Sequence, residues 1–121
     1  MIQLLKRIGE HYSMSNYMYE LQYLPSFYYD LEEKVSYIAK ELKNPQAANE
    51  LIDAVEKAIV ERQCNAESFE KYHSSKERRY PYYRIYVKNY VIYYVVINNG
   101  EHKIMEVRRM LYKKQNFSVV I

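Results

Sequence analysis

Residues 82–117 read YYRIYVKNYVIYYVVINNGEHKIMEVRRMLYKKQNF. Three runs rich in tyrosine and β-branched residues are separated by Lys88-Asn89 and by Asn98-Asn99-Gly100, and the second break is a strong hairpin signal. The spacing predicts an antiparallel three-stranded meander over residues 82–87, 91–97 and 101–111. Arginines and lysines are interleaved with the tyrosines along this stretch. Such a sheet presents a basic, aromatic surface, which suits a nucleic acid or an acidic partner better than a small metabolite.

The segment before the meander carries one more strand and two helices. Alternating apolar and polar residues over 19–23 predict a short strand that ends at Pro25. Apolar residues recur at helical spacing over 26–42, and the pair Asn44-Pro45 marks the start of a second helix that runs to about residue 62. The sequence therefore predicts an α+β fold in which a helical hairpin packs on one face of a largely antiparallel sheet. The opposite face is left for function.

Composition narrows the class of protein. The chain has 121 residues, a length that corresponds to one modest domain. Its net charge is +3. Acidic residues concentrate in 30–70 and basic residues follow Lys76. The single Cys64 excludes an internal disulfide and has no metal-ligand partner at useful spacing. No apolar run approaches the roughly 18 residues that a membrane span needs. We expect a cytoplasmic protein that does not enter a membrane.

The N-terminal segment differs from the rest of the chain. Gly9 and the polar run 13–16 interrupt its apolar pattern, so residues 1–17 are expected to be an appendage and residues 18–121 to form the single domain. No P-loop, dinucleotide fingerprint or His-Glu metal motif occurs, and two glycines are too few for a glycine-rich phosphate cradle. The sequence therefore predicts no cofactor and no bound metal.

Several segments taken together resemble a known family. They are YELQYLPS from residue 19, DLE from 30, YIA from 37, YRIYV from 83, YVIYYVV from 90 and VRRMLY from 107. Their order and spacing over about residues 18–117 are similar to the RelE/ParE superfamily of toxins from type II toxin-antitoxin modules. The resemblance implies a growth-inhibiting toxin that is neutralised by an antitoxin wrapped around it. One branch of this superfamily cleaves messenger RNA in the ribosomal A site, and another poisons DNA gyrase.

The resemblance also implies a set of catalytic residues. Arg84 matches a basic position of the RNA-cleaving branch, whereas Tyr86 stands where that branch has a second basic residue. Cleavage by the 2′-hydroxyl of the RNA needs a base, an acid, and cations that stabilise the phosphorane. We expect the cations to be Arg84, Lys113 and Lys114, and the proton shuttles to be Tyr86 or Tyr112. A tyrosine is a weak base here, because its ordinary pKa is about 10. The three histidines, at 11, 73 and 102, fall outside the expected catalytic face.

Other side chains of the basic, aromatic surface have two interpretations each. Four are expected to contact a nucleic acid: Arg78, Arg79, Lys88 and Arg109. Arg109 equally suits a buried ion pair with Asp30 or Glu33. The tyrosines of the meander suit either packing or base stacking, and the candidates for stacking are Tyr82, Tyr90 and Tyr93.

Three functions are consistent with these features. The expected function is that of a ribosome-dependent mRNA endoribonuclease that inhibits translation without a metal. The alternatives are a ParE-like inhibitor of DNA gyrase without catalytic activity, and an inactive member that only binds its antitoxin. The expected partners are a cognate acidic antitoxin together with the ribosome and mRNA, or with DNA gyrase in the first alternative. Apolar positions with a cationic rim present a groove that suits an acidic amphipathic segment.

Overall fold

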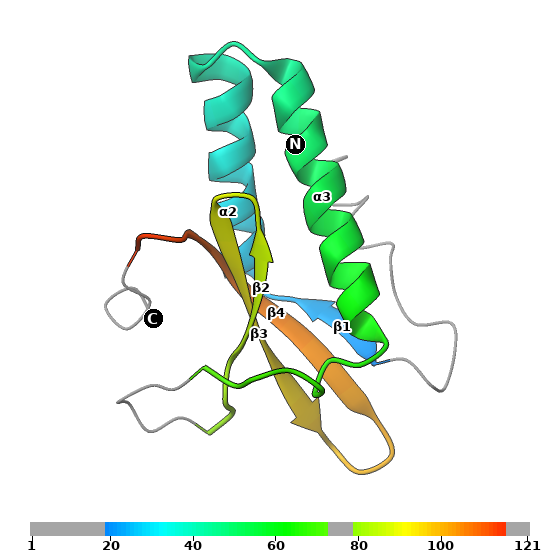
Figure 1. Ribbon diagram of the computed structural model, residues 1–121. Coiled ribbons are helices and arrows are strands. Elements are labelled where there is room, and N and C mark those ends of the chain that lie inside the picture. The colour runs from blue at the N-terminus through cyan, green and yellow to red at the C-terminus, as the bar shows by residue number, and fades with distance from the viewer. Residues whose placement is uncertain (1–18, 73–78, 116–121) are drawn as a thin grey trace.

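The computed structural model describes residues 19–72 and 79–115. In chain order its elements are β1 (Glu20–Tyr23), α2 (Pro25–Ser36), the π-helical turn η1 (Tyr37–Glu41), α3 (Pro45–Gln63), β2 (Tyr83–Val87), β3 (Tyr90–Asn98) and β4 (Lys103–Tyr112). The strands form one sheet in the order β1-β4-β3-β2, and the helical hairpin lies against it (Figure 1). The fold is α+β, as the sequence predicts. The predicted appendage, residues 1–17, lies outside the described residues.

The second helix of the hairpin, α3, begins where the Asn44-Pro45 pair predicts. Pro45 is the first residue of α3, and the Asn44 side chain accepts a hydrogen bond from the Ala47 N–H at 3.0 Å. This cap satisfies one of the N–H groups that the first turn of a helix leaves without a partner. In Figure 1 the connected ends of α2 and α3 project beyond the sheet.

The first helix ends earlier than its apolar pattern predicts. It becomes a π-helical turn after Ser36, in which the Leu42 N–H donates to the Tyr37 carbonyl at 3.1 Å, five residues back. Lys43 then takes a positive φ of 50°, a conformation that cannot continue a right-handed helix. The connection therefore exposes Leu42 at the free end of the hairpin.

The meander forms as predicted, with strand ends that differ by one or two residues. Gly100 has a φ of 94°, and its N–H donates to the Asn98 side chain at 3.2 Å. The other turn places Lys88 at a φ of 52°. Ahead of β2, one isolated antiparallel bridge joins Lys71 to Tyr83.

The edge of β4 is covered by two successive elements. β1 pairs with β4 in parallel, with Leu21 opposite Met105. Where β1 ends, α2 takes over: the Ser26 hydroxyl donates to the Arg108 carbonyl at 2.7 Å, and the Asp30 carboxylate accepts from the Met110 N–H at 2.9 Å. Side chains of a helix thus satisfy backbone groups that would otherwise remain open at a sheet edge.

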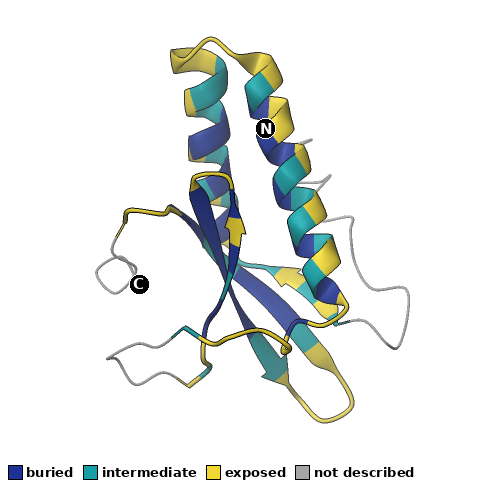
Figure 2. Ribbon diagram, viewed as in Figure 1, coloured by how far each residue is buried: buried dark blue, intermediate teal, exposed yellow. Residues whose placement is uncertain are grey.

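The main core lies between the helices and the sheet. Its buried members include Phe27, Leu31 and Val55 from the helices and Ile92 and Met110 from the strands. Figure 2 shows buried positions along the sides of the helices and strands that face one another. Within the described residues, no helix is long and apolar enough to cross a membrane.

The second face of the sheet is less open than the sequence predicts. A second cluster of buried side chains lies there, formed by Tyr82, Val91, Tyr93, Val95 and Leu111, with Tyr72, Tyr80 and Ile97 packed against it. The nearly continuous apolar run of β3 is typical of a strand buried on both faces. Of the β2 side chains on this face, Tyr86 is exposed, and it lies near the end of the sheet that carries the turn between β2 and β3.

Candidate functional site

Four side chains at this end of the sheet form what we call the cation–tyrosine cluster: Tyr72, Arg84, Tyr86 and Lys113. The Arg84 guanidinium carbon lies 5.0 Å from the centre of the Tyr72 ring and 5.8 Å from that of Tyr86. The Lys113 Nζ lies 5.7 Å from the centre of the Tyr86 ring. Strand alternation produces this arrangement, because Tyr83, Ile85 and Val87 are buried in the main core and β2 therefore projects Arg84 and Tyr86 to the other side.

Backbone contacts hold the cluster in place. The Arg62 side chain donates to the Arg84 carbonyl at 3.1 Å, and the Lys113 N–H donates to the Asn89 carbonyl at 2.9 Å. The second contact sets Lys113 beside the turn that carries Lys88, which is exposed. Lys114 follows and is also exposed. Positive charge therefore gathers where β2 turns into β3 and β4 ends.

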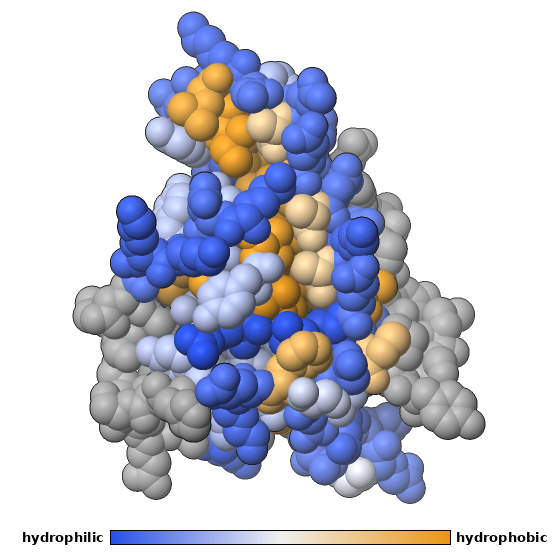
Figure 3. Space-filling model, in the orientation of Figure 1, coloured by the Kyte–Doolittle hydropathy of each residue, from blue (hydrophilic) through white to orange (hydrophobic). Residues whose placement is uncertain are grey.

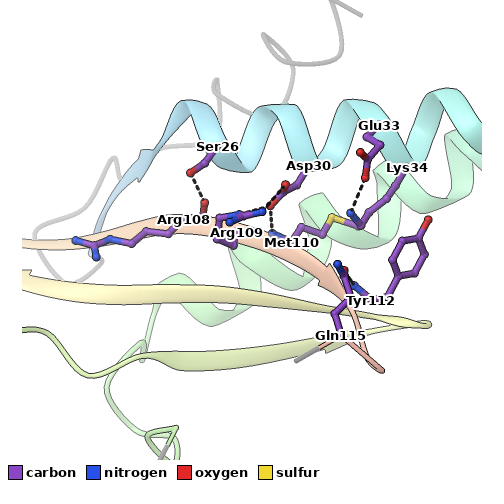
Figure 4. Close-up of polar contacts among 9 residues, drawn as sticks. All are labelled: Ser26, Asp30, Glu33, Lys34, Arg108, Arg109, Met110, Tyr112 and Gln115. Atoms are coloured by element: carbon purple, nitrogen blue, oxygen red, sulfur yellow. Dashed lines mark hydrogen bonds and ion pairs between the residues drawn. The ribbon is translucent and has the colours of Figure 1, made fainter. Parts of the chain in front are cut away.

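Arg109 makes an ion pair with α2 (Figure 4). Its Nε donates to Asp30 Oδ2 at 2.7 Å and its terminal nitrogen donates to Asp30 Oδ1 at 3.1 Å. The hydrogen bond to Asp30 raises the pKa of Arg109 above its ordinary value. Of the two interpretations of Arg109, the ion pair is the one present, and it occupies the donors that a phosphate contact would use.

Tyr112 lies apart from the cluster, near α2. Its ring is 5.2 Å from that of Tyr90, a member of the main core, and the Lys34 Nζ lies 4.8 Å from its centre (Figure 4). Burial and the nearby Glu33 carboxylate raise the pKa of Tyr112. A raised pKa makes this phenol a poorer source of a basic phenolate at neutral pH. Because Tyr112 lies near α2 and Tyr86 lies in the cluster, the two predicted proton shuttles are not brought together.

A second arginine network escapes sequence reasoning. Arg108 donates to Glu106 at 2.7 Å and to the Tyr82 hydroxyl at 3.2 Å, and the Gln22 amide donates to the same Glu106 carboxylate. Burial alone would lower the pKa of Arg108, but the hydrogen bonds to Tyr82 and Glu106 outweigh it and raise that pKa. The pairing of β3 with β4 shifts register at Tyr93/Tyr94, so the alternation of Arg108 with its neighbours is broken. A bulge of this kind leaves no signature in the composition of the strand.

The three tyrosines proposed for base stacking are buried. Tyr82, Tyr90 and Tyr93 are 5–8% exposed, which leaves no ring face for a base, so this prediction is wrong. Tyr86 is the most exposed ring of the meander, at 57%, and Tyr112 at the end of β4 is 39% exposed. The runs of consecutive tyrosines hide this difference, because side-chain alternation and the packing of Tyr72 and Tyr80 against the second cluster decide which ring faces solvent.

The remaining predicted contacts are scattered. Arg79 is exposed, with its guanidinium carbon 5.3 Å from the centre of the Tyr80 ring, and Arg78 lies outside the described residues. His102 is in the turn between β3 and β4, at the far end of β3 from the cluster. The other two histidines lie outside the described residues. No histidine of residues 19–72 and 79–115 therefore lies beside the cation–tyrosine cluster.

Comparison with known proteins decides the family. Residues 21–117 match the family model of the ParE toxin of the type II toxin-antitoxin system parDE. The chain belongs to this ParE toxin family. A solved structure described as the chromosomal ParDE TA system from P. aeruginosa has a TM-score of 0.58 and 13% identity, covering 81% of this chain and 98% of that chain. At that identity the likeness concerns the fold. A search among curated proteins found no match. Membership in a type II toxin-antitoxin family brings with it a cognate antitoxin as partner.

Proposed function

We propose that this ParE-family toxin acts by inhibiting DNA gyrase, and that it does so by binding and not by cutting RNA. The family match carries this proposal, because it favours the ParE branch over the RNA-cleaving branch that the sequence analysis expects. A binding toxin needs no general base, no general acid and no arranged cations. A binding toxin can therefore function with a tyrosine at position 86, where the RNA-cleaving branch has a basic residue.

The distribution of the predicted catalytic groups supports the same conclusion. Efficient proton transfer requires a base and an acid within hydrogen-bond reach of the reacting atoms. Tyr112 lies near Lys34 and α2, whereas Tyr86 lies beside Arg84 and Lys113. Arg109 is already engaged by Asp30. Tyr112 and Arg109 thus do not join Tyr86, Arg84 and Lys113 around one phosphate, so a metal-independent ribonuclease is the weaker interpretation.

The test uses purified full-length toxin and purified gyrase. We expect the toxin to inhibit ATP-dependent supercoiling of a relaxed plasmid in proportion to its concentration, and to leave messenger RNA on translating ribosomes intact. A matched double variant, Arg84→Gln with Lys114→Gln, separates the two functions, because RNA cleavage depends on these cations. Cleavage of ribosome-bound mRNA that disappears in the double variant, with unaltered supercoiling, would overturn the proposal.

The antitoxin surface is proposed at the free end of the helical hairpin. Leu42 is 56% exposed and Tyr37 is 49% exposed there, and Lys40 and Lys43 are exposed beside them. Figure 3 shows apolar atoms over this end and along the strip between the two helices. An acidic amphipathic segment would bury the apolar side chains and pair with the lysines. We therefore propose that the cognate antitoxin is acidic and covers this strip.

A further inference from the structure

We propose that the cation–tyrosine cluster is a binding site for single-stranded nucleic acid, in which a base stacks on Tyr86 and its phosphate lies between Arg84 and Lys113. This inference goes beyond gyrase inhibition, because it assigns the toxin a second kind of ligand. It predicts binding that is measurable in the absence of gyrase.

Tyr86 has the properties of a stacking platform. It is 57% exposed, while the neighbouring side chains of β2, Ile85 and Val87, are buried. Cations lie against it at 5.8 Å and 5.7 Å from the ring centre, from Arg84 and Lys113. A base on an exposed aromatic ring contributes about 5- to 150-fold in affinity, and every base has a face that can stack.

Within the described residues, the two cations of the cluster keep side-chain donors that no hydrogen bond or ion pair engages. In residues 19–72 and 79–115, the side chains of Arg84 and Lys113 make no hydrogen bond or ion pair, and the buried Nε of Arg84 has no hydrogen-bond partner. The other cations of the sheet differ, since Arg108 is paired with Glu106 and Arg109 with Asp30. Arg84 and Lys113 therefore remain available to an anion.

The spacing of these charges suits a phosphate backbone. Lys88 lies in the turn next to Tyr86, and Lys114 follows Lys113, so the two central cations are flanked by one lysine on each strand end. Positive charges beside an exposed aromatic ring are the combination found in proteins that bind single strands. A duplex keeps its base faces stacked, so Tyr86 would have no face to meet there. A single strand is the ligand that uses both features.

The experiment is a fluorescence-anisotropy titration of the full-length toxin with labelled DNA and RNA single strands of about 12 nucleotides, a length within the range that one small domain covers. We expect Tyr86→Ala to weaken binding by about tenfold or more and Tyr86→Phe to retain it. Arg84→Gln and Lys113→Gln should each weaken binding and lower its dependence on salt concentration. The duplex form of the same DNA should bind more weakly than the single strand.

Matched controls test whether the site is specific. Tyr29→Ala removes a tyrosine that is 72% exposed on α2, and Lys57→Gln removes a lysine that is 76% exposed on α3. Both should leave the affinity unchanged. An equal loss in these controls, an undisturbed affinity in Tyr86→Ala, or equal binding of a polyglutamate peptide of similar charge would overturn the inference. Because supercoiling is measured separately with gyrase, failure here is distinguishable from failure of the proposed function. Preference for DNA or for RNA identifies the source of the strand.

Discussion

Asp30 of α2 binds Arg109 of β4 through both carboxylate oxygens, at 2.7 Å and 3.1 Å, and also accepts the Met110 N–H at 2.9 Å. One side chain thus neutralises an arginine and closes the edge of a strand. The side chains of Asp30 and Arg109 are 13% and 23% exposed, so solvent screens this pair only in part. The contact fixes where α2 lies along β4, and with it the geometry of the sheet end that carries Lys113.

Loss of this contact should destabilise the fold. Asp30→Ala leaves a half-buried guanidinium without its counter-charge and the Met110 N–H without its acceptor, and we expect the free energy of unfolding to fall by about 2–4 kcal/mol. Asp30→Asn keeps an acceptor and should cost less. Urea denaturation measures both. The exposed pair of Lys57 and Glu61 serves as control, because Glu61→Gln should change stability by less than about 0.5 kcal/mol. An equally small effect of Asp30→Ala would contradict the role assigned to the pair.

Tyr94 should make stability depend on alkaline pH. Burial raises the pKa of Tyr94 to about 12 despite the opposing hydrogen bond from Arg62, whereas an unfolded tyrosine ionises at about pH 10. Between these values the folded chain holds one proton more than the unfolded chain, so stability falls as the pH rises, by about 2–3 kcal/mol over the interval. Stability measured against pH in the native chain and in Tyr94→Phe isolates this effect from that of the other tyrosines.

Near neutral pH, Tyr94→Phe should be less stable than the native chain. The Tyr94 hydroxyl donates to the Ala66 carbonyl at 2.6 Å and accepts from Arg62 at 3.0 Å, and its removal should cost about 1–2 kcal/mol. Because the native chain loses about 2–3 kcal/mol between about pH 10 and pH 12, the two stability curves should meet within that interval. Curves that stay parallel from pH 8 upward would show that Tyr94 does not titrate as its burial implies.

Lys34 is a buried charge with weak compensation. It is 2% exposed, and its Nζ lies 3.5 Å from the carboxylate of Glu33, which is itself 74% exposed. Replacing a poorly paired buried charge by an apolar side chain of similar length is often neutral or stabilising, so Lys34→Met should raise the free energy of unfolding by about 1 kcal/mol. A destabilisation of similar size in thermal or urea unfolding would mean that the ammonium holds the Tyr112 ring more strongly than the geometry indicates.

The proposed antitoxin surface predicts that a negative charge introduced at the hairpin weakens antitoxin binding. Leu42→Asp removes an exposed apolar side chain and adds a negative charge opposite an acidic partner, so affinity for the cognate antitoxin should fall by more than about tenfold. Isothermal titration calorimetry measures this. Tyr29→Asp introduces the same charge at another exposed position of α2 and should leave the affinity unchanged. Equal effects of the two substitutions would place the antitoxin elsewhere.

The elements of this fold follow from local signals, whereas the site depends on contacts between distant segments. Asn44-Pro45 and Asn98-Asn99-Gly100 fix a helix start and a hairpin from their own chemistry. The pairing of β1 with β4 joins residues 84 apart, and periodicity within either strand does not specify it. The exposure of Tyr86 beside buried tyrosines depends on side-chain alternation in β2 and on where Tyr72 and Tyr80 pack against the second face. The bulge at Arg108 affects the pairing of Arg108 with Glu106 and of Arg109 with Asp30, and no sequence pattern in Val107–Leu111 predicts it.

Pulse labelling of DNA and protein synthesis in a bacterium, within minutes of inducing the full-length chain, tests gyrase inhibition most directly. We predict an early fall in DNA synthesis while protein synthesis continues, because a gyrase-directed toxin blocks the template before it affects translation. The Leu42→Asp variant should keep this effect and escape the antitoxin. An early collapse of protein synthesis with DNA synthesis still running would contradict gyrase as the target and return Arg84, Lys113 and Lys114 to the role of a ribosomal RNase site.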